Sequence, residues 1–262
     1  MPPAMPVILL PPSEGKASGG HGTPWAPGSM AIDLDADRER VLRALATAMR
    51  RSEAERGRLL GVKGQALAGA TAANRDVREA PTMPAIERYT GVLYDAIDPR
   101  SMSATQRRRL DASVVIVSGL WGLVTPRDPI PDYKLKIGVR LGRFGRLSSW
   151  WRADLSARLA EVSSGRAIWN LLPNEHAAAW RAPDGVRQWS VRFLEPGRDG
   201  SLTAVSHWNK LLKGALVRFL VANPAAGPDE LAGWEHPMGF RYDPSRDAEH
   251  TGITMLTFVS TA

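Results

Sequence analysis

Cysteine is absent from this chain of 262 residues, which excludes disulfide bonds and thiolate chemistry. No apolar run approaches the roughly 20 residues of a membrane-spanning helix, and the first residues lack the pattern of a secretory signal peptide. The five histidines are scattered without a His-x-His or His-x-x-x-His pair, and no nucleotide-binding fingerprint is present. These absences predict a cytoplasmic protein with no membrane partner, no metal and no cofactor.

Positive charge, by contrast, is abundant. The formal net charge is +7 and the isoelectric point is ≈ 10.1, which permits a nucleic acid or an anionic metabolite as partner. Many arginines stand beside acidic residues on expected helices, so we favour a solvated helix surface over a dedicated nucleic-acid stripe.

Strand signals are distributed along the whole chain. Continuous apolar runs predict strands covered on both faces; they span residues 7–10, 114–117 and 167–171. Strict alternation over 133–141 predicts a half-exposed strand. A late hairpin is expected between 186–194 and 202–206, and segments 240–242 and 253–259 are expected to complete the sheet.

Helical patterns interrupt these strands irregularly, for example over 33–56 and 208–222. We therefore predict the α+β class, with one domain over residues 1–262 and a mixed β-sheet flanked by helices. Residues 17–30 are rich in Gly, Pro and Ser and predict a flexible loop. We expect a monomer.

The most informative segment is 118–135, which links a buried strand to the alternating segment. Such connections commonly carry the sites of open sheets. Asp128 stands between prolines, where a carboxylate can orient a lysine or act as a base; an exposed aspartate in a turn is the alternative interpretation. Ser118 lacks the Gly-x-Ser-x-Gly elbow of a nucleophile. Tyr133 and Lys134 should point to opposite faces, so only one is expected to face a site.

Five separated segments resemble, in order, the YaaA family of peroxide-stress proteins, and are closest to its actinobacterial branch. The segments are residues 10–16, 84–94, 118–135, 170–175 and 206–219. The resemblance implies a compact α+β fold with a deep cleft, a link to peroxide stress and iron handling, and DNA binding through a helix-hairpin-helix element. It settles no reaction.

The chain departs from this family pattern in the segments expected to form the cleft. The departures are Asn170, His176, Leu212 and Lys213. They suggest a specialised paralogue that keeps the fold and changes the chemistry.

Candidate anion-binding residues follow several expected strands. Lys16 and Ser13 follow the first strand, but the phosphate-binding loop pattern fails because its first Gly and its hydroxyl residue are missing. With the resemblance, we interpret Lys16 as a point charge for a phosphate, sulfate or carboxylate. The other candidates for this role are Tyr89, Ser118, Asn170, Asn174, His207, Lys210 and Lys213.

Alternatives accompany several of these residues. Asn174 could equally cap a helix, and Tyr89 could equally be a packed tyrosine with a satisfied hydroxyl. His207 and Lys210 share one helix face with Gly214, where glycine indicates a close backbone or ligand approach. The candidates for proton transfer are Asp128, His176 and Tyr133.

The DNA-binding expectation concerns residues 57–75. Gly61, Lys63 and Gly64 lie between two expected helices, where backbone N–H groups could meet a phosphate. An ordinary turn with a glycine C-cap would produce the same pattern.

Two functional hypotheses remain. The first is a YaaA-like stress protein that binds double-stranded DNA or an anionic ligand in a basic cleft. The alternative is a non-redox enzyme, for elimination, cyclisation or group transfer, acting on an anionic small molecule in a specialised-metabolite pathway.

Overall fold

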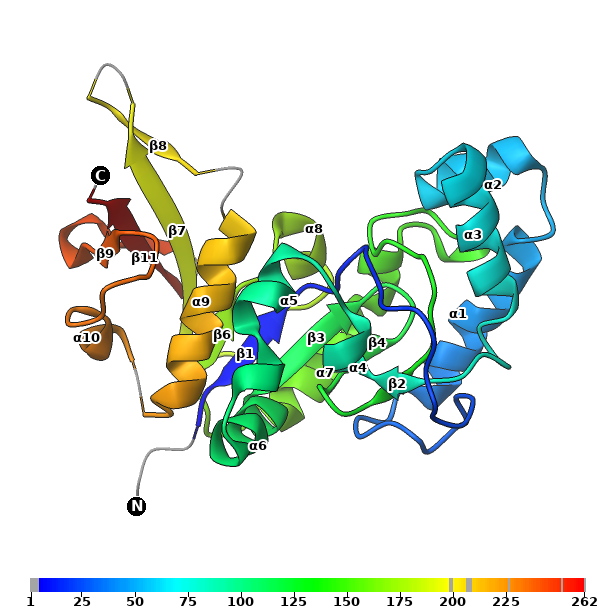
Figure 1. Ribbon diagram of the computed structural model, residues 1–262, viewed down its shortest axis with the longest axis horizontal. Coiled ribbons are helices and arrows are strands. Elements are labelled where there is room, and N and C mark those ends of the chain that lie inside the picture. Colours follow the sequence, from blue (N-terminus) through cyan, green and yellow to red (C-terminus); the bar gives the residue numbers. More distant parts are fainter. Residues whose placement is uncertain (1–4, 198–199, 206–208, 226, 251, 262) are drawn as a thin grey trace.

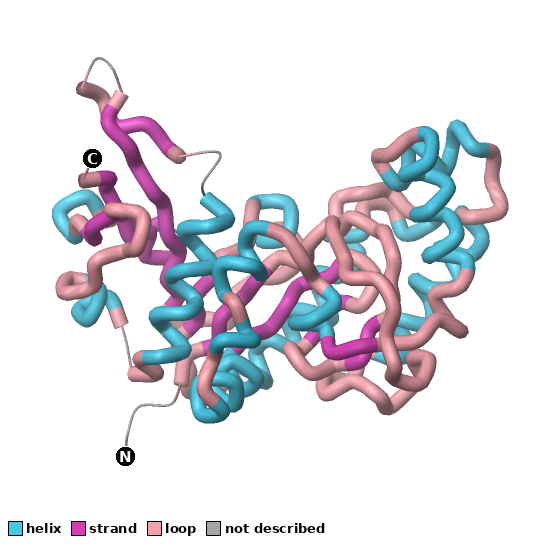
Figure 2. Tube along the Cα trace, in the orientation of Figure 1, coloured by secondary structure: helices cyan, strands magenta, loops and turns pink. Residues whose placement is uncertain are grey.

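A mixed β-sheet forms the centre of the computed structural model, which describes residues 5–197, 200–205, 209–225, 227–250 and 252–261 (Figures 1 and 2). The strands follow one another in the order β10 (Ala248–His250), β11 (Ile253–Ser260), β7 (Gln188–Pro196), β6 (Ile168–Asn170), β1 (Val7–Leu10), β3 (Val114–Ser118) and β4 (Gly122–Val124). β8 (Leu202–Ala204) pairs with β7, and β9 (Phe240–Tyr242) pairs with β11. The predicted α+β class with a mixed sheet is confirmed.

Parallel pairing joins β3, β1, β6, β7 and β11 in the middle of this sheet, and antiparallel strands extend it. β1 and β3 are buried at every position, which explains their continuous apolar sequences. Because the carboxyl ends of parallel strands share one edge of a sheet, the segments that follow β1, β3 and β6 emerge near one another.

Helices cover the sheet and also form a group beside it. In Figure 1, α5 (Val92–Ile97), α6 (Ala104–Ser113) and α9 (Asn209–Ala222) lie in front of the sheet, and α7 (Leu147–Val162) lies behind it. The group beyond β4 comprises α1 (Asp35–Ala48), α2 (Glu53–Leu60) and α3 (Gly64–Arg75). The shorter elements are α4 (Ala85–Arg88), α8 (Asn174–Ala177), α10 (Pro228–Leu231), the strand pair β2 (Met83–Pro84) and β5 (Pro129–Ile130), and the 3₁₀ turns Pro99–Ser101, Gly142–Phe144 and Pro244–Arg246.

Within the described ranges, none of the helices combines the length and the apolar character that crossing a bilayer requires.

The predicted helix over 33–56 is wrong, because the chain forms two helices there, α1 and α2. Ser52 starts α2 with a capping box: its hydroxyl accepts the Glu55 N–H, and the Glu55 carboxylate accepts the Ser52 N–H. Ser-x-x-Glu is a helix start signal that apolar periodicity overlooks.

The predicted strand over 133–141 is also wrong, because this segment is irregular. Its alternation is real: Tyr133 and Leu135 are buried and Lys134 is half-buried. However, the Asn74 side chain takes the place of a partner strand, donating to the Lys134 carbonyl at 2.9 Å and accepting the Lys134 N–H at 2.8 Å. The alternation of apolar and polar residues shows which side chains face the core. It does not show which groups form hydrogen bonds with the backbone N–H and C=O of the segment.

The loop over 17–30 contains no helix or extended strand, and two of its side chains reach the core. Trp25 packs on Trp121 with ring centroids 5.4 Å apart, and Met30 is also buried. These contacts anchor the loop to the protein, while its flexibility stays a prediction.

Gly214 in α9 lies where α9 packs closely on α5. A Cβ atom at this position would stand 2.6 Å from both the Leu93 carbonyl oxygen and the Ala96 Cβ. A close backbone approach therefore explains this glycine, as the sequence suggested.

We expect Gly214→Ala to lower the free energy of unfolding by about 1–3 kcal/mol, because the packed helices must separate. Urea denaturation measures this change. Gly69→Ala in α3 is the matched control, because nothing lies within 4 Å of its Cβ position; it should be neutral or stabilising by up to about 1 kcal/mol. Equal losses in the two variants would contradict the assignment of Gly214 to a close helix contact.

Candidate functional site

A pocket of about 110 Å³ lies where the chain leaves β1, with walls from segment 133–136 and from α8. Its lining residues are Pro12, Ser13, Glu14, Lys16, Tyr133, Lys134, Leu135, Lys136, Glu175 and His176. A second cavity of about 190 Å³ shares Lys16 and Tyr133 and has the small residues of α3 as its other wall. Lys16 therefore lies between two cavities, and we call the first of them the Lys16 pocket.

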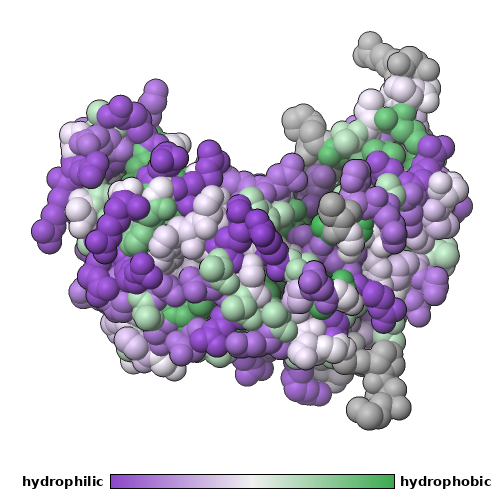
Figure 3. Space-filling view, turned by 180° about the vertical axis from the view of Figure 1, so that it is seen from behind, coloured by the Kyte–Doolittle hydropathy of each residue, from purple (hydrophilic) through white to green (hydrophobic). Residues whose placement is uncertain are grey.

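On a larger scale, Figure 3 shows a concave surface between the part of the molecule that carries α1–α3 and the part that carries β7 and β8.

The Lys16 amine is desolvated and lacks a carboxylate partner. Its Nζ donates to the Ser13 carbonyl at 3.2 Å and lies 4.3 Å from the centroid of the Tyr133 ring. Among the described residues, no carboxylate oxygen lies within 4.0 Å of it. Burial lowers the pKa of Lys16 to about 8, although Asp132 opposes this shift.

Three buried hydroxyl groups adjoin this lysine. The Tyr133 hydroxyl lies 2.7 Å from the Tyr89 hydroxyl and 2.7 Å from Ser118 Oγ. Ser118 Oγ already accepts the backbone N–H groups of Leu120 and Trp121, so its own proton is donated to Tyr133.

The two tyrosine hydroxyl groups share one hydrogen bond. One phenolic proton serves the Tyr89–Tyr133 contact, so the other has no hydroxyl acceptor left within the trio. Burial raises the pKa of Tyr133 to about 12 and raises the pKa of Tyr89 well above its usual value, so both phenols are protonated. Ser118 is fully buried, which makes it a hydrogen-bonding residue here and not an accessible nucleophile.

Acidic and basic side chains rim the pocket, and Glu14 and Lys136 among them were missed from the sequence. Glu14 forms ion pairs with Lys136 at 2.8 Å and with Lys134 at 3.1 Å. The hydrogen bond from Lys136 is the main reason that the pKa of Glu14 falls to about 2. The alternation of 133–137 could have indicated Lys134 and Lys136, which share its outer face. The expectation that only one of Tyr133 and Lys134 faces the site is wrong, since both line the pocket.

His176 enters the pocket from α8. Its Nδ1 is buried and has no hydrogen-bond partner among the described residues. Burial lowers the pKa of His176 to about 4, so the imidazole is neutral at pH 7. A neutral, unpartnered ring nitrogen can donate to or accept from a bound ligand.

Asn174, the first residue of α8, is exposed and does not line the pocket. Its side chain makes no capping bond, because Pro173 is the N-cap.

Asn170 and Lys213 lie together at the carboxyl end of β6, outside the lining of the pocket. Asn170 Oδ1 accepts the Leu172 N–H at 3.2 Å. Lys213 Nζ donates to the Leu171 carbonyl at 3.1 Å, and burial lowers the pKa of Lys213 to about 8. Lys213 is thus a second desolvated amine held by a backbone carbonyl.

Lys210 is exposed in the first turn of α9 and does not line the Lys16 pocket. His207 lies outside the described residues. Leu212 is fully buried, and its carbonyl lies 3.0 Å from His236 Nε2. The structure therefore brings Lys16, Ser13, Tyr133 and His176 together, with Tyr89 and Ser118 behind them, and leaves Lys210 and Asn174 outside.

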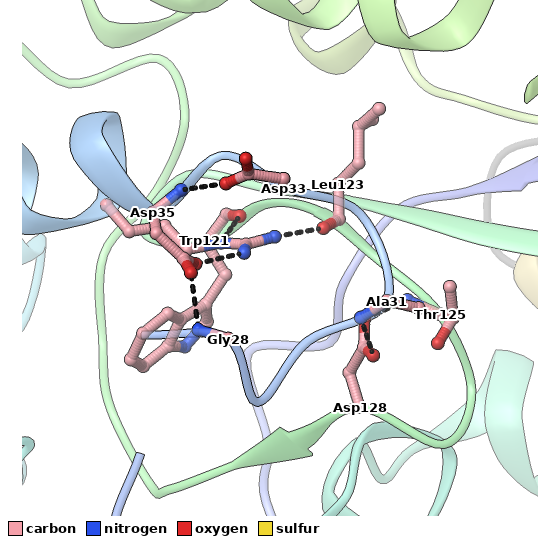
Figure 4. A network of polar contacts seen from close by, with 9 residues as sticks. Gly28, Ala31, Asp33, Asp35, Trp121, Leu123, Thr125 and Asp128 are labelled. Atoms are coloured by element: carbon pink, nitrogen blue, oxygen red, sulfur yellow. Dashed lines mark hydrogen bonds and ion pairs between the residues drawn. The ribbon is translucent and has the colours of Figure 1, made fainter. Parts of the chain in front are cut away.

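Asp128 also lies elsewhere, in the network of Figure 4. Its two carboxylate oxygens accept the backbone N–H groups of Ala31 at 2.8 Å and Thr125 at 2.7 Å. The side chain is 3% exposed. The alternative interpretation of an exposed turn aspartate is therefore right about the turn and wrong about the exposure, and Asp128 contributes no lining to the Lys16 pocket.

The residues expected to bind DNA form the turn of a helical hairpin. α2 ends at Leu60, Gly61 is a left-handed C-cap with φ 67°, and α3 begins at Gly64 after the extended Lys63. Gly61, Lys63 and Gly64 lie at the turn, which is open to solvent at Gly61 and Gly64. Lys63 makes no side-chain cap, so the first N–H groups of α3 lack a side-chain acceptor.

Fold and site together define an α+β protein with a lysine pocket at the carboxyl edge of its parallel strands and a helical hairpin alongside. The model of the family described as "Peroxide stress protein YaaA" matches residues 7–246, and the chain belongs to this family. The resemblance stated from the sequence is thereby confirmed.

The chain is also similar to curated relatives of the UPF0246 group. It is 39% identical to a UPF0246 protein of Streptomyces coelicolor over 249 residues, covering 93% of this chain and 94% of the relative. A UPF0246 protein of Corynebacterium glutamicum is 35% identical over 219 residues, covering 82% and 84%. A more distant one, from Bacteroides thetaiotaomicron, is 29% identical over 181 residues, covering 64% and 68%.

Proposed function

We propose that this YaaA-family protein binds an anionic small molecule in the Lys16 pocket. The observation that carries the proposal is the Lys16 amine, which is desolvated and, among the described residues, donates to a backbone carbonyl and lies over the Tyr133 ring without a carboxylate within 4.0 Å. An anion would supply the missing counter-charge. The His176 Nδ1, which lacks a partner among the described residues, offers a hydrogen bond to the same ligand.

The family's name also supports a cellular context of peroxide stress, which we propose for this chain. The alternative of a non-redox enzyme is not favoured: of its two candidates for moving a proton, Asp128 and His176, only His176 lines the pocket.

We expect Lys16→Met to weaken the binding of sulfate at least about tenfold, because a desolvated charge-assisted contact is lost. Isothermal titration calorimetry measures the affinity, and sulfate is the probe because it does not titrate near neutral pH. Arg100→Met removes an equal charge from an exposed site and should leave the affinity unchanged.

The pH dependence provides a second measurement. The pKa of Lys16 is about 8 without ligand, so sulfate affinity should be constant near pH 6–7 and fall as pH rises through 8. His176 stays neutral over this range and contributes no change. Sulfate binding that is equal in both variants, or that is independent of pH between 7 and 9, would falsify the proposal.

We also propose that the α2–α3 hairpin binds the backbone of double-stranded DNA. The turn over 61–64 favours this function, because it presents the Lys63 charge next to uncapped N–H groups at the start of a twelve-residue helix.

Lys63→Glu should weaken duplex binding, and the slope of log affinity against log salt should become shallower by about one unit. Fluorescence anisotropy over a salt series measures both quantities. Arg100→Glu, an exposed change of the same charge far from the hairpin, is the control. Failure of the unmodified protein to bind a duplex at low salt would remove this function while leaving the pocket proposal intact.

A further inference from the structure

A groove of about 810 Å³ lies against α1 and α2 and is closed on its other side by segment 139–144. Its volume is in the range of ordinary ligand sites. None of its lining residues belongs to the Lys16 pocket. Its rim carries the arginines Arg40, Arg43, Arg51, Arg58, Arg140 and Arg143, and Glu55 is the one acidic residue that lines it.

The positive charge of this rim is only partly compensated. Three of its arginines form ion pairs with residues three or four positions away in the chain; the pairs are Arg40–Asp37 at 2.9 Å, Arg43–Glu39 at 3.6 Å and Arg51–Glu55 at 3.3 Å. Arg58, Arg140 and Arg143 have no carboxylate within 4.0 Å in the part of the chain that the structure describes. Guanidinium groups facing one another across a groove attract a partner with several negative charges.

The floor of the groove is largely aliphatic, which favours a partner with apolar groups over one that presents only charged and polar groups. Its apolar lining residues are Ala44, Ala48, Leu59, Val139, Leu141 and Phe144. Duplex DNA presents phosphates and sugars to a protein surface and would leave such a floor unfilled.

The aromatic rings at one end do not offer a free stacking platform. Phe144 packs on Trp150 with centroids 4.7 Å apart. Arg40 lies over Trp150 at 5.1 Å, and Arg143 lies over Phe144 at 5.9 Å. The bases of a single strand need open aromatic faces, so these occupied rings disfavour that ligand.

We propose that this arginine-rimmed groove binds an acidic amphipathic segment of another protein. Apolar side chains on one face of the segment fill the aliphatic floor, as in helix-in-groove recognition. Its carboxylates pair with Arg58, Arg140 and Arg143, whose planar guanidinium groups suit bidentate contacts. This site is separate from the anion pocket and does not depend on it.

The test uses a fluorescent 16-residue helical peptide with Leu at i, i+3, i+4 and i+7 spacing and Glu on the remaining positions. We expect binding by anisotropy at micromolar concentration. Arg58→Glu with Arg140→Glu should weaken it at least about tenfold, because two charge pairs become repulsions. Leu59→Ser, which changes the floor and not the charge, should also weaken it. Arg100→Glu is the charge control and should have less than about a twofold effect.

Two further ligands test which chemical class of partner the groove binds. A peptide with Ser in place of every Leu keeps the charge and should bind at least about tenfold more weakly, because the floor stays empty. Equal binding of that peptide would overturn the proposal, as would no binding of the Leu peptide at 1 mM (about −4 kcal/mol). The second ligand is a single-stranded oligothymidylate. If it bound more tightly than the Leu peptide, and if this binding depended on Arg58, the groove would be a nucleic-acid site and the proposal would be overturned. Circular dichroism and the binding of sulfate to each variant verify that it is folded.

Discussion

Arg38→Met should lower the free energy of unfolding by about 3–5 kcal/mol, the cost of breaking a buried ion pair by removing one partner. The Arg38 side chain is fully buried in α1. It donates to the carbonyls of Trp121 and Leu123, both at 3.0 Å, and to Asp35 at 2.8 Å (Figure 4). Methionine fills much of the volume but donates to none of these acceptors; Asp35 keeps only its hydrogen bond from the Gly28 N–H among the contacts drawn in Figure 4.

Arg40→Met is a control for this prediction on the same helix. Arg40 forms an ion pair at the same spacing, with Asp37 at 2.9 Å, but its side chain is 48% exposed. We expect a loss below about 1 kcal/mol, as for other surface pairs. Chemical denaturation of both variants measures the difference, and comparable losses would contradict the central role of Arg38 in joining α1 to β4.

Asp128→Ala should lower the free energy of unfolding by about 2–5 kcal/mol, because two backbone N–H groups, those of Ala31 and Thr125, lose their acceptor. Asp184→Ala, at an exposed turn, should change it by less than about 0.5 kcal/mol.

A second measurement separates this structural role from the role of a base in the pocket. At a temperature where Asp128→Ala is folded, its sulfate affinity should match that of the unmodified protein. Weak sulfate binding by a folded, stable Asp128→Ala protein would restore Asp128 to the site.

Strands buried on both faces could be predicted from the sequence, because a continuous apolar run leaves neither face suited to solvent. β1, β3 and β6 lie where those runs predicted them, and the hairpin of β7 and β8 forms as expected. β4 escaped prediction, since Gly122–Val124 follows β3 after only a tight turn and resembles part of a connection. The division between α1 and α2 escaped because both helices carry polar faces and the start signal at Ser52 is local.

The site could be predicted only in part. Lys16 and Ser13 were interpreted as anion-binding residues from their place after the first strand together with the family resemblance, and that role stays a prediction. Glu14 and Lys136 form an ion pair at the rim because two segments that are far apart in the sequence pack together. No local sequence pattern indicates this packing. Asp128 was placed in the site because its sequence neighbourhood is rigid, but rigidity does not indicate the direction in which a loop points.

The amide of Asn74 holds Lys134 by two hydrogen bonds, one in each direction, in the manner of a neighbouring strand. Asn74 belongs to α3, and Lys134 lines the Lys16 pocket. A displacement of α3 must therefore either break both bonds or carry the wall of the pocket with it. If a partner that moves α3 changes the affinity of this pocket for a ligand, thermodynamic linkage requires that the ligand change the partner's affinity by the same factor.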